Sequence, residues 1–196
     1  MAVRRATQDD TPRIAAVLAE AFSHDPPMRW FMAVSPRRTE RLRRLFMTLV
    51  PRFYISHGEA WVSDEPLGAA LWVEPGSWPA PARTQLATAP ALLRAFGPHP
   101  RRAIAGVRTI ERGHPHEPHW YLDYIGVEPA ARSRGTGAAL LAPMLERCDA
   151  ERVPAYLNAG SSRSRDLYAR HGFEVTQRYE LPFGGPPLWR MWREPS

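Results

Sequence analysis

Strand-like segments recur along the chain as apolar or alternating runs that end near turn-forming Gly, Pro, Asp or Asn residues. The expected strands are residues 3–6, 60–63, 68–73, 120–127, 154–158, 174–181 and 188–193. A turn at residues 64–66 joins the second and third of these, so a β-hairpin is expected there. Another turn, at residues 182–187, joins the last two strands.

Helical segments, with apolar residues at three- and four-residue spacing, lie between the strands. They are expected from Thr7 through Phe22, from Pro36 to Phe53, within residues 75–100, over residues 101–112 and after Gly137. Thr7 and Asp10 form a capping-box pattern at the start of the first helix. Pro51 is expected to bend or end the second helix, because proline lacks the N–H that an interior helical bond needs. Hairpins with helices between them predict an α+β domain, a mixed α/β chain with mostly antiparallel strands.

The most informative stretch joins the strand at residues 120–127 to the helix that follows. Pro129 cannot extend the strand, which is therefore expected to stop near Glu128. The turn after it holds Gly135 and Gly137, and glycine lets backbone N–H groups approach a ligand closely. A helix N-terminus behind such a turn favours negative charge, so the layout suits a pyrophosphate. The turn lacks the Gly-Lys-Ser/Thr ending of a P-loop and the first glycine of the dinucleotide fingerprint.

Length and composition predict one domain over residues 1–196. No apolar run reaches the ~18 residues of a membrane span. Residues 1–10 have no apolar signal-peptide core and Cys148 is the only cysteine, so a reducing, cytoplasmic location is expected. The net charge is +6 and every basic side chain apart from histidine is arginine. No nucleic-acid recognition motif accompanies the arginines, so we interpret them as a solvated surface whose field favours a polyphosphate ligand.

Two motifs in a fixed order carry a family resemblance. Val127-x-Pro129 precedes Arg132-x-x-Gly135-x-Gly137-Ala138, and the later run is Leu167-Tyr168-x-x-x-Gly172-Phe173. This pair resembles the acetyl-CoA signature and the tyrosine motif of the GCN5-related N-acetyltransferase (GNAT) family. Matching pieces span nearly the whole chain except residues 80–113, and they look most like the puromycin N-acetyltransferase branch of that family.

The resemblance implies a GNAT-like fold: a twisted, mostly antiparallel central sheet of about six to seven strands, flanked by helices, with acetyl-CoA at splayed central strands. Acetyl-CoA is then the cosubstrate and no metal is expected. The cofactor-binding residues that the resemblance implies are Ile125, Gly126, Val127, Arg132, Ser133, Arg134, Gly135, Thr136, Gly137, Ala138, Asn158, Ser161 and Ser164. Asn158 stands where the puromycin branch has a glutamate, and Ser161 where an asparagine is common in the family.

Three side chains are candidates for the chemistry. Tyr168 stands at the position of the family's general acid, and a phenol of pKa ~10 can protonate a thiolate whose thiol has pKa ~8.5. Asp123, on the central strand, can accept the proton of the amine directly or through water. Tyr121 stands where some family members carry a catalytic glutamate. By strand alternation, Tyr121, Asp123 and Ile125 are expected on one face.

Other chemistry-bearing residues are secondary. Glu59 and His57 are reserve candidates for the base. The histidine-rich segment 114–119 looks like a set of metal ligands, but its two prolines interrupt any shared helical face, so no metal site is expected. Cys148 falls on an apolar helical stripe and is expected to be a buried, inert thiol. Some aromatic residues can line an acceptor pocket, although most are expected in the core: Phe22, Trp30, Phe31, Phe46, Phe53 and Trp72.

The resemblance implies direct acetyl transfer from acetyl-CoA to an amine of a small molecule, such as an antibiotic or another secondary metabolite. Two alternatives stay open. The acceptor can be the N-terminus or a lysine of a protein or peptide, or the chain can be a non-catalytic module that binds acyl-CoA and regulates a partner. A monomer or homodimer without a nucleic-acid or membrane partner is expected.

Overall fold

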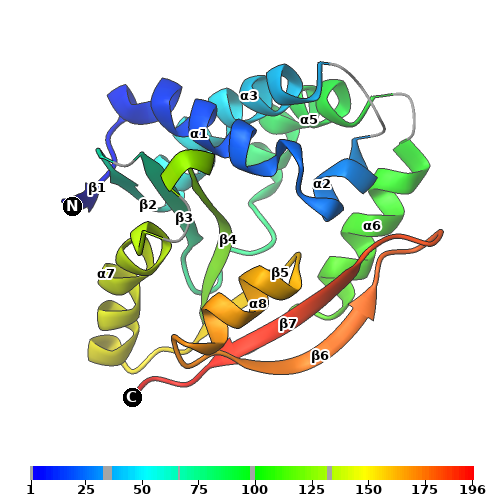
Figure 1. Cartoon of the computed structure of the whole chain (residues 1–196). Helices are drawn as coiled ribbons and strands as arrows, with labels where there is room; N and C mark the ends of the chain where they lie inside the picture. The colour runs from blue at the N-terminus through cyan, green and yellow to red at the C-terminus, as the bar shows by residue number, and fades with distance from the viewer. Residues whose placement is uncertain (1, 33–36, 66, 98–99, 132–133) are drawn as a thin grey trace.

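A central β-sheet organises the molecule (Figure 1). The computed structural model describes residues 2–32, 37–65, 67–97, 100–131 and 134–196. Within them, a seven-stranded sheet has the order β1-β2-β3-β4-β5-β7-β6, and only β4 and β5 pair in parallel. The strands are β1 Val3–Arg5, β2 Gly58–Ser63, β3 Gly68–Val73, β4 Trp120–Val127, β5 Ala155–Ala159, β6 Glu174–Glu180 and β7 Pro187–Arg193. The expected mixed α/β fold with a mostly antiparallel sheet is confirmed.

Helices cover both faces of this sheet (Figure 1). They are α1 Thr11–Ser23, α2 Pro26–Phe31, α3 Arg38–Leu49, α4 Ile55–His57, α5 Ala82–Phe96, α6 Pro100–Arg112, α7 Thr136–Glu151 and α8 Ser162–Ala169, with short 3-10 turns at Gln8–Asp10 and Pro129–Ala131. The apolar sides of α1 and α3 pack on one face, in a core that includes Leu18, Phe46 and Leu71. The other face packs against α7, through residues such as Leu141 and Met144. Burial of these stripes is the main force that holds the layers together.

The break expected at Pro51 takes the form of a π-helical turn. Helix α3 ends at Leu49, and the π turn spans Val50–Tyr54 before α4 begins. Proline cannot donate the interior bond of an α-helix, and a wider turn is one way to continue the chain. The turn carries Tyr54 into the core below the central strand, where its hydroxyl contacts Asp123.

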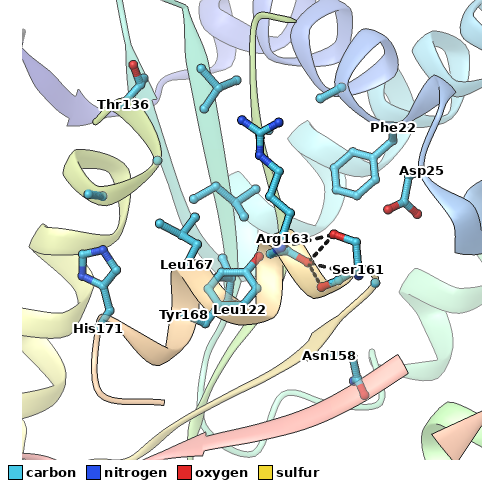
Figure 2. Close-up of a pocket in the computed structure, with 18 of the residues that line it drawn as sticks. Phe22, Asp25, Leu122, Thr136, Asn158, Ser161, Arg163, Leu167, Tyr168 and His171 are labelled. Atoms are coloured by element: carbon cyan, nitrogen blue, oxygen red, sulfur yellow. Dashed lines mark hydrogen bonds between the residues drawn. The ribbon is translucent and has the colours of Figure 1, made fainter. Parts of the chain in front are cut away.

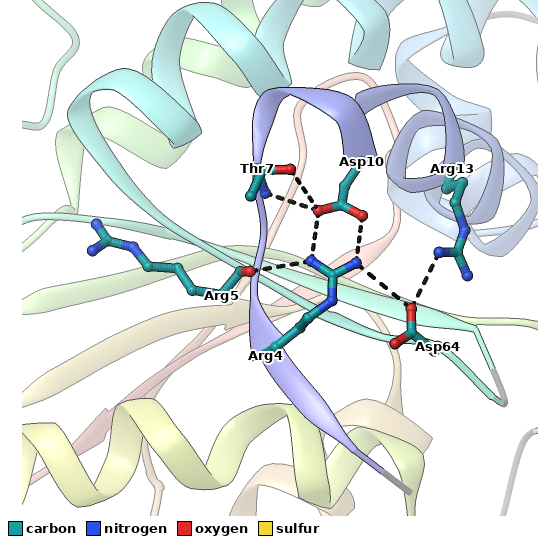
Figure 3. Close-up of polar contacts among 6 residues, drawn as sticks. All are labelled: Arg4, Arg5, Thr7, Asp10, Arg13 and Asp64. Atoms are coloured by element: carbon teal, nitrogen blue, oxygen red, sulfur yellow. Dashed lines mark hydrogen bonds and ion pairs between the residues drawn. The ribbon is translucent and has the colours of Figure 1, made fainter.

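The predicted capping box at the first helix is confirmed and belongs to a larger network (Figure 3). The Thr7 N–H donates to Asp10 at 2.8 Å, and both terminal nitrogens of Arg4 donate to the same carboxylate at 2.7 and 2.8 Å. These bonds hold the pKa of Asp10 well below its usual value, chiefly through Arg4. Asp64, in the β2–β3 turn, forms an ion pair with Arg13 at 3.1 Å. The network therefore ties β1, α1 and the first hairpin together.

A bulge interrupts the central strand. Leu71 pairs with Tyr124 and the next residue of β3, Trp72, pairs with Leu122, so Asp123 has no partner residue on β3. The bulge changes which face later side chains point to: Tyr121 packs in the core beneath α1 and α3, whereas Ile125 packs in the core beneath α7. The expectation that Tyr121, Asp123 and Ile125 share one face is therefore wrong.

The two central strands separate just beyond the bulge. Parallel pairing joins β4 to β5 only over Trp120–Leu122 and Ala155–Leu157. The remainder of β4 and the end of β5 leave their backbone groups facing an opening between the strands. This opening, at the middle of the sheet, positions the candidate site.

Candidate active site

A cavity of about 670 Å³ lies where β4 and β5 separate (Figure 2). Its lining comes from the end of α1, the α1–α2 turn, the last part of β4, the first turn of α7, the end of β5 and helix α8. Figure 2 shows Phe22 and Asp25 on one side of the cavity and Leu167 and Tyr168 on the other. Segments from across the sequence thus meet at one site.

The first turn of α7 lines one end of this cavity. Gly135, at the N-cap, has φ +82° and ψ −3°, a left-handed conformation that favours glycine. The cavity contacts Gly135, Thr136, Gly137 and Ala138. The first N–H groups of a helix have no intrahelical acceptor, and the Thr136 hydroxyl is buried without a hydrogen-bond partner among the described residues. These free donors suit an anion, and their binding of a pyrophosphate stays a prediction.

Not all of the residues expected to bind the pyrophosphate before α7 line the cavity. Arg132 and Ser133 lie outside the described residues, so their role stays a prediction. Arg134 is exposed and does not line the cavity. Three basic side chains of helix α8 and the turn after it do line the cavity, and sequence reasoning missed them: Arg163, Arg170 and His171.

The strand ends supply the middle of the cavity. Ile125, Gly126 and Val127 line it from β4, and their predicted contact with the cofactor stays a prediction. Asn158 lines it from β5; its Oδ1 accepts from the Tyr179 hydroxyl at 2.8 Å, and its Nδ2 is buried without a partner in the described chain. A donor held this way, beside unpaired strand backbone, suits an extended ligand with amide groups.

Ser161 and Ser164 also line the cavity, but they form the cap of α8. The Ser164 N–H donates to the Ser161 hydroxyl at 3.2 Å, and the Ser161 N–H donates to the Ser164 hydroxyl at 3.1 Å. Their hydroxyl groups are therefore already engaged in positioning the helix that carries Tyr168.

Tyr168 faces the cavity from α8 and is only 6% exposed. Burial raises the pKa of its hydroxyl above the usual value of 10, and the nearby charge of Asp25 raises it further. The phenol therefore keeps its proton throughout the neutral range. It is available as a proton donor at the centre of the site.

Asp123 sits on the β4 bulge and also lines the cavity. The Tyr54 hydroxyl donates a short hydrogen bond to its Oδ2, and the Tyr121 hydroxyl lies 3.2 Å from its Oδ1. Burial raises the pKa of the carboxyl group to about 6, although both hydrogen bonds act to lower it. A carboxylate with this pKa can take up a proton near neutrality, as a general base requires.

Two tyrosine hydroxyl groups contact the carboxylate of Asp123. Tyr121 is buried and does not line the cavity, so the structure places its hydroxyl behind the carboxylate. Tyr54 occupies the equivalent place on the other carboxylate oxygen, and sequence reasoning missed it because the π turn that presents it has no clear sequence signature.

The reserve candidates for the base lie elsewhere. Glu59 is buried outside the cavity, within 2.9 Å of Arg5 and 2.7 Å of Arg147. Glu59 is therefore engaged in ion pairs away from the cavity and is not placed to contact a ligand there. The side chain of His57 lies outside the described part of the structure.

Among the aromatic candidates for an acceptor pocket, Phe22 lines the cavity. The other five are buried in the core, as expected for most of them: Trp30, Phe31, Phe46, Phe53 and Trp72. Their role is therefore packing. Phe22 makes an edge contact with Tyr124, with ring centroids 5.4 Å apart.

The histidine-rich segment forms a packed pair. The His119 Nδ1–H donates to the Glu117 carbonyl at 2.6 Å, so its Nε2 accepts from His114 Nε2–H at 3.1 Å. Burial lowers the pKa of His114 to about 3 and also lowers that of His119, so both rings are neutral. Among the described residues, no group of three or more His, Cys, Asp or Glu side chains is arranged to hold a metal.

Cys148 is buried in the core beneath α7, as expected. Burial raises the pKa of its thiol to about 12. The thiolate is therefore scarce near neutrality, and direct transfer needs no cysteine nucleophile.

Asp25 is a further candidate that sequence patterns did not indicate. It caps α2, accepting from the Met28 N–H at 3.1 Å, and it lines the cavity. Burial raises its pKa to about 6. A carboxylate just before two prolines gives the same sequence signal as an ordinary helix cap, so its place in the cavity emerges only from the fold.

The comparisons with known proteins identify the family. The model of the acetyltransferase (GNAT) family matches residues 18–173, which include both glycines of the α7 turn and Tyr168. The chain belongs to the GNAT acetyltransferase family. It is an acyltransferase, and members of this family use acetyl-CoA as cosubstrate.

Individual relatives agree with this assignment. A crystal structure of a "histone acetyltransferase HPA2 and related acetyltransferase" from Corynebacterium glutamicum is 32% identical, with a TM-score of 0.77 over 99% of this chain and 96% of that one. An uncharacterised N-acetyltransferase of Schizosaccharomyces pombe is 26% identical over 100% of this chain and 84% of its own length. A polyamine N-acetyltransferase of Drosophila melanogaster shares the fold, with a TM-score of 0.65 at 14% identity over 98% and 99% of the two chains. No helix in the described residues of this acetyltransferase has the length and apolar character to cross a membrane.

Proposed function

We propose that this acetyltransferase transfers acetyl directly from acetyl-CoA to an amine of a small molecule. The observation that carries the proposal is that one cavity joins a helix N-terminus with free N–H groups to a carboxylate of pKa about 6 and a protonated phenol. The family assignment supplies the reaction, and the cavity supplies groups that fit each part of it.

The residues present fit acetyl-CoA. Free N–H groups at the start of α7 and the unpartnered Thr136 hydroxyl can hold the pyrophosphate, and the arginines of α8 add positive charge. The end of β4 at Val127 and the free Nδ2 of Asn158 can bind the amide-bearing pantetheine arm. The N–H of Ile125 is the donor proposed for the thioester carbonyl, and a donor of this kind typically contributes about 3 kcal/mol.

Two proton transfers complete the reaction. The neutral acceptor amine attacks the thioester carbonyl, and Asp123 accepts a proton from its nitrogen, directly or through water, as the new C–N bond forms. The C–S bond then breaks, and Tyr168 donates its proton to the departing thiolate. Tyr54 and Tyr121 hold the Asp123 carboxylate in place rather than reacting themselves.

A small acceptor is supported by the position of these groups in a cavity of about 670 Å³ lined by α1, β4 and α8. The sequence likeness to puromycin N-acetyltransferase supports an antibiotic or similar metabolite, although Asn158 replaces that branch's glutamate. A protein N-terminus or lysine is the second candidate acceptor, because one relative is described as a histone acetyltransferase. We expect the enzyme to act in the cytoplasm.

The test is acetyl-CoA-dependent thiol release with a panel of small amines, including puromycin, and a panel of peptides. Tyr168→Phe is the diagnostic variant: turnover is expected to fall about 100-fold, the usual scale for a general acid, with little change in acetyl-CoA affinity. Turnover equal to that of the wild type would remove Tyr168 from the mechanism. Release with peptides alone would replace the small-molecule proposal with the second candidate.

A further inference from the structure

Asp25 occupies a position in the cavity that the proposed reaction does not use. Its Oδ2 accepts the Met28 N–H, which fixes the carboxylate at the start of α2. Its Oδ1 points toward the turn between β5 and α8, where a Cβ added to Gly160 would come within 3.1 Å of it. The carboxylate therefore lies at the side of the cavity near the end of β5, beside Phe22 in Figure 2.

This carboxylate lacks a cation. None of the described arginines or histidines forms an ion pair with Asp25, and within the described chain Oδ1 receives no hydrogen bond. Other carboxylates among the described residues have partners: Asp10 pairs with Arg4, Glu59 with two arginines, and Asp123 accepts from two phenols. A half-buried carboxylate without a cation beside it is partly desolvated, and a positively charged ligand in the cavity offsets that cost.

Two carboxylates consequently line the α1–β4 side of the cavity, which we call the acceptor half because Asp123 is the proposed base. Asp123 comes from the β4 bulge and Asp25 from the α1–α2 turn, and both side chains belong to residues that line the cavity. The cations that line the cavity belong largely to α8 and the turn after it. The acceptor half is thus negative, whereas the α7–α8 end suits phosphate groups.

We propose that Asp25 binds a second positive charge of the acceptor, so that the preferred substrates are diamines, or amines that also carry a guanidinium group. The proposal rests on the proposed acetyl transfer. The reacting nitrogen must lose a proton to Asp123 and cannot remain a cation at Asp25. Two carboxylates on different elements therefore accommodate two nitrogens of one molecule, with Phe22 against the carbon chain between them.

The test compares diamines from 1,3-diaminopropane to 1,6-diaminohexane with monoamines of the same carbon number. Calorimetry on the full chain saturated with CoA measures binding without turnover. At least one diamine is expected to bind about 10- to 100-fold more tightly than its monoamine, the range for a charge-assisted hydrogen bond. Equal affinities for every pair, or no detectable binding of any diamine, would overturn the proposal.

Asp25→Asn isolates the charge, because asparagine keeps an oxygen for the Met28 N–H and is an equally good N-cap. In this variant the diamine preference is expected to fall below about threefold, since the charged interaction is gone. Asp166→Asn, an equal change of charge on the exposed side of α8, should retain the preference. A preference that persists in Asp25→Asn would contradict the role of Asp25.

Further measurements distinguish a misfolded variant, a failure of the proposed acetyl transfer and a failure of the proposed role of Asp25. Thermal unfolding and CoA affinity establish that Asp25→Asn is folded, and Asp25→Ser, another capping residue, replaces it if it is not. Thiol release with the same amine pairs tests acetyl transfer itself. Absence of turnover with every amine would refute the proposed function even where the diamine preference is present, whereas turnover without that preference would refute only the role of Asp25.

Discussion

The carboxylate of Asp123 should destabilise the folded protein above pH 6. Its folded pKa is about 6, raised by burial from 3.8, so folding favours the protonated form. The contribution of such a group to the unfolding free energy is fully present below pH 3.8, the pKa of the unfolded state. It is lost as the pH rises through 6, the pKa of the folded state. A shift of about two units corresponds to about 3 kcal/mol at most, and partial exposure of the site reduces this to roughly 1–3 kcal/mol.

Asp123→Asn tests this reasoning because asparagine resembles the neutral carboxyl group and does not titrate. At pH 8 the variant should be more stable than the wild type by about 1–3 kcal/mol, which corresponds to a rise in Tm of roughly 2–10 °C. Between pH 6 and pH 4 the difference should shrink toward zero. The shift of Asp25 is present in both proteins and cancels.

Urea unfolding of both proteins at pH 8, 6 and 4.5 measures the difference. Asp166→Asn is the matched control, and its exposed carboxylate should change the unfolding free energy by less than about 0.5 kcal/mol. A variant that is less stable at pH 8, or a difference that does not vary with pH, would refute the claim that burial of this charge is costly. Asp123→Asn should also have lost most of its acetyl-transfer activity. The Asp123 carboxylate would then lower the stability of the fold while being required for activity.

The remaining predictions concern the pKa of Asp123, its hydrogen bond from Tyr54, and Glu59, which lies outside the cavity. The acidic limb of kcat/KM in the wild type should rise through about pH 6. Tyr54→Phe removes a hydrogen bond that lowers the pKa of Asp123, so this limb should move upward by about one pH unit; an unmoved limb would mean that Asp123 does not control it. Glu59→Gln should lower the unfolding free energy by about 2–4 kcal/mol, because it disrupts a buried ion pair, yet leave kcat and the pH profile unchanged; an altered pH profile would return Glu59 to the mechanism.

Local chemistry explains which parts of the fold are predictable from the sequence. Pro129 stops the central strand at Val127, and the Thr7–Asp10 capping box begins the first helix, because both effects depend on residues close in sequence. The glycine turn before α7 is equally local, and the structure places Gly135 in the left-handed conformation at the N-cap.

The parts that sequence reasoning missed depend on contacts between distant segments. The bulge at Asp123 arises from the pairing of β3 with β4, and strict alternation therefore assigns the wrong face to Ile125. Tyr54 reaches Asp123 only through the π turn, although 69 positions separate them. Asp25 enters the cavity because α1 packs across the sheet toward the β5–α8 turn, which no local pattern encodes.

The central claim is that the first turn of α7 holds the pyrophosphate of acetyl-CoA. Calorimetric titration of acetyl-CoA into the wild type and Gly137→Val tests it most directly, since a side chain at this position would extend toward Leu167 and narrow the cavity. We predict saturable binding at one site in the wild type and affinity at least about 10-fold weaker in a folded variant, equivalent to a loss of about 1.4 kcal/mol. Binding of equal strength in the variant, or no saturable binding to the wild type, would contradict it.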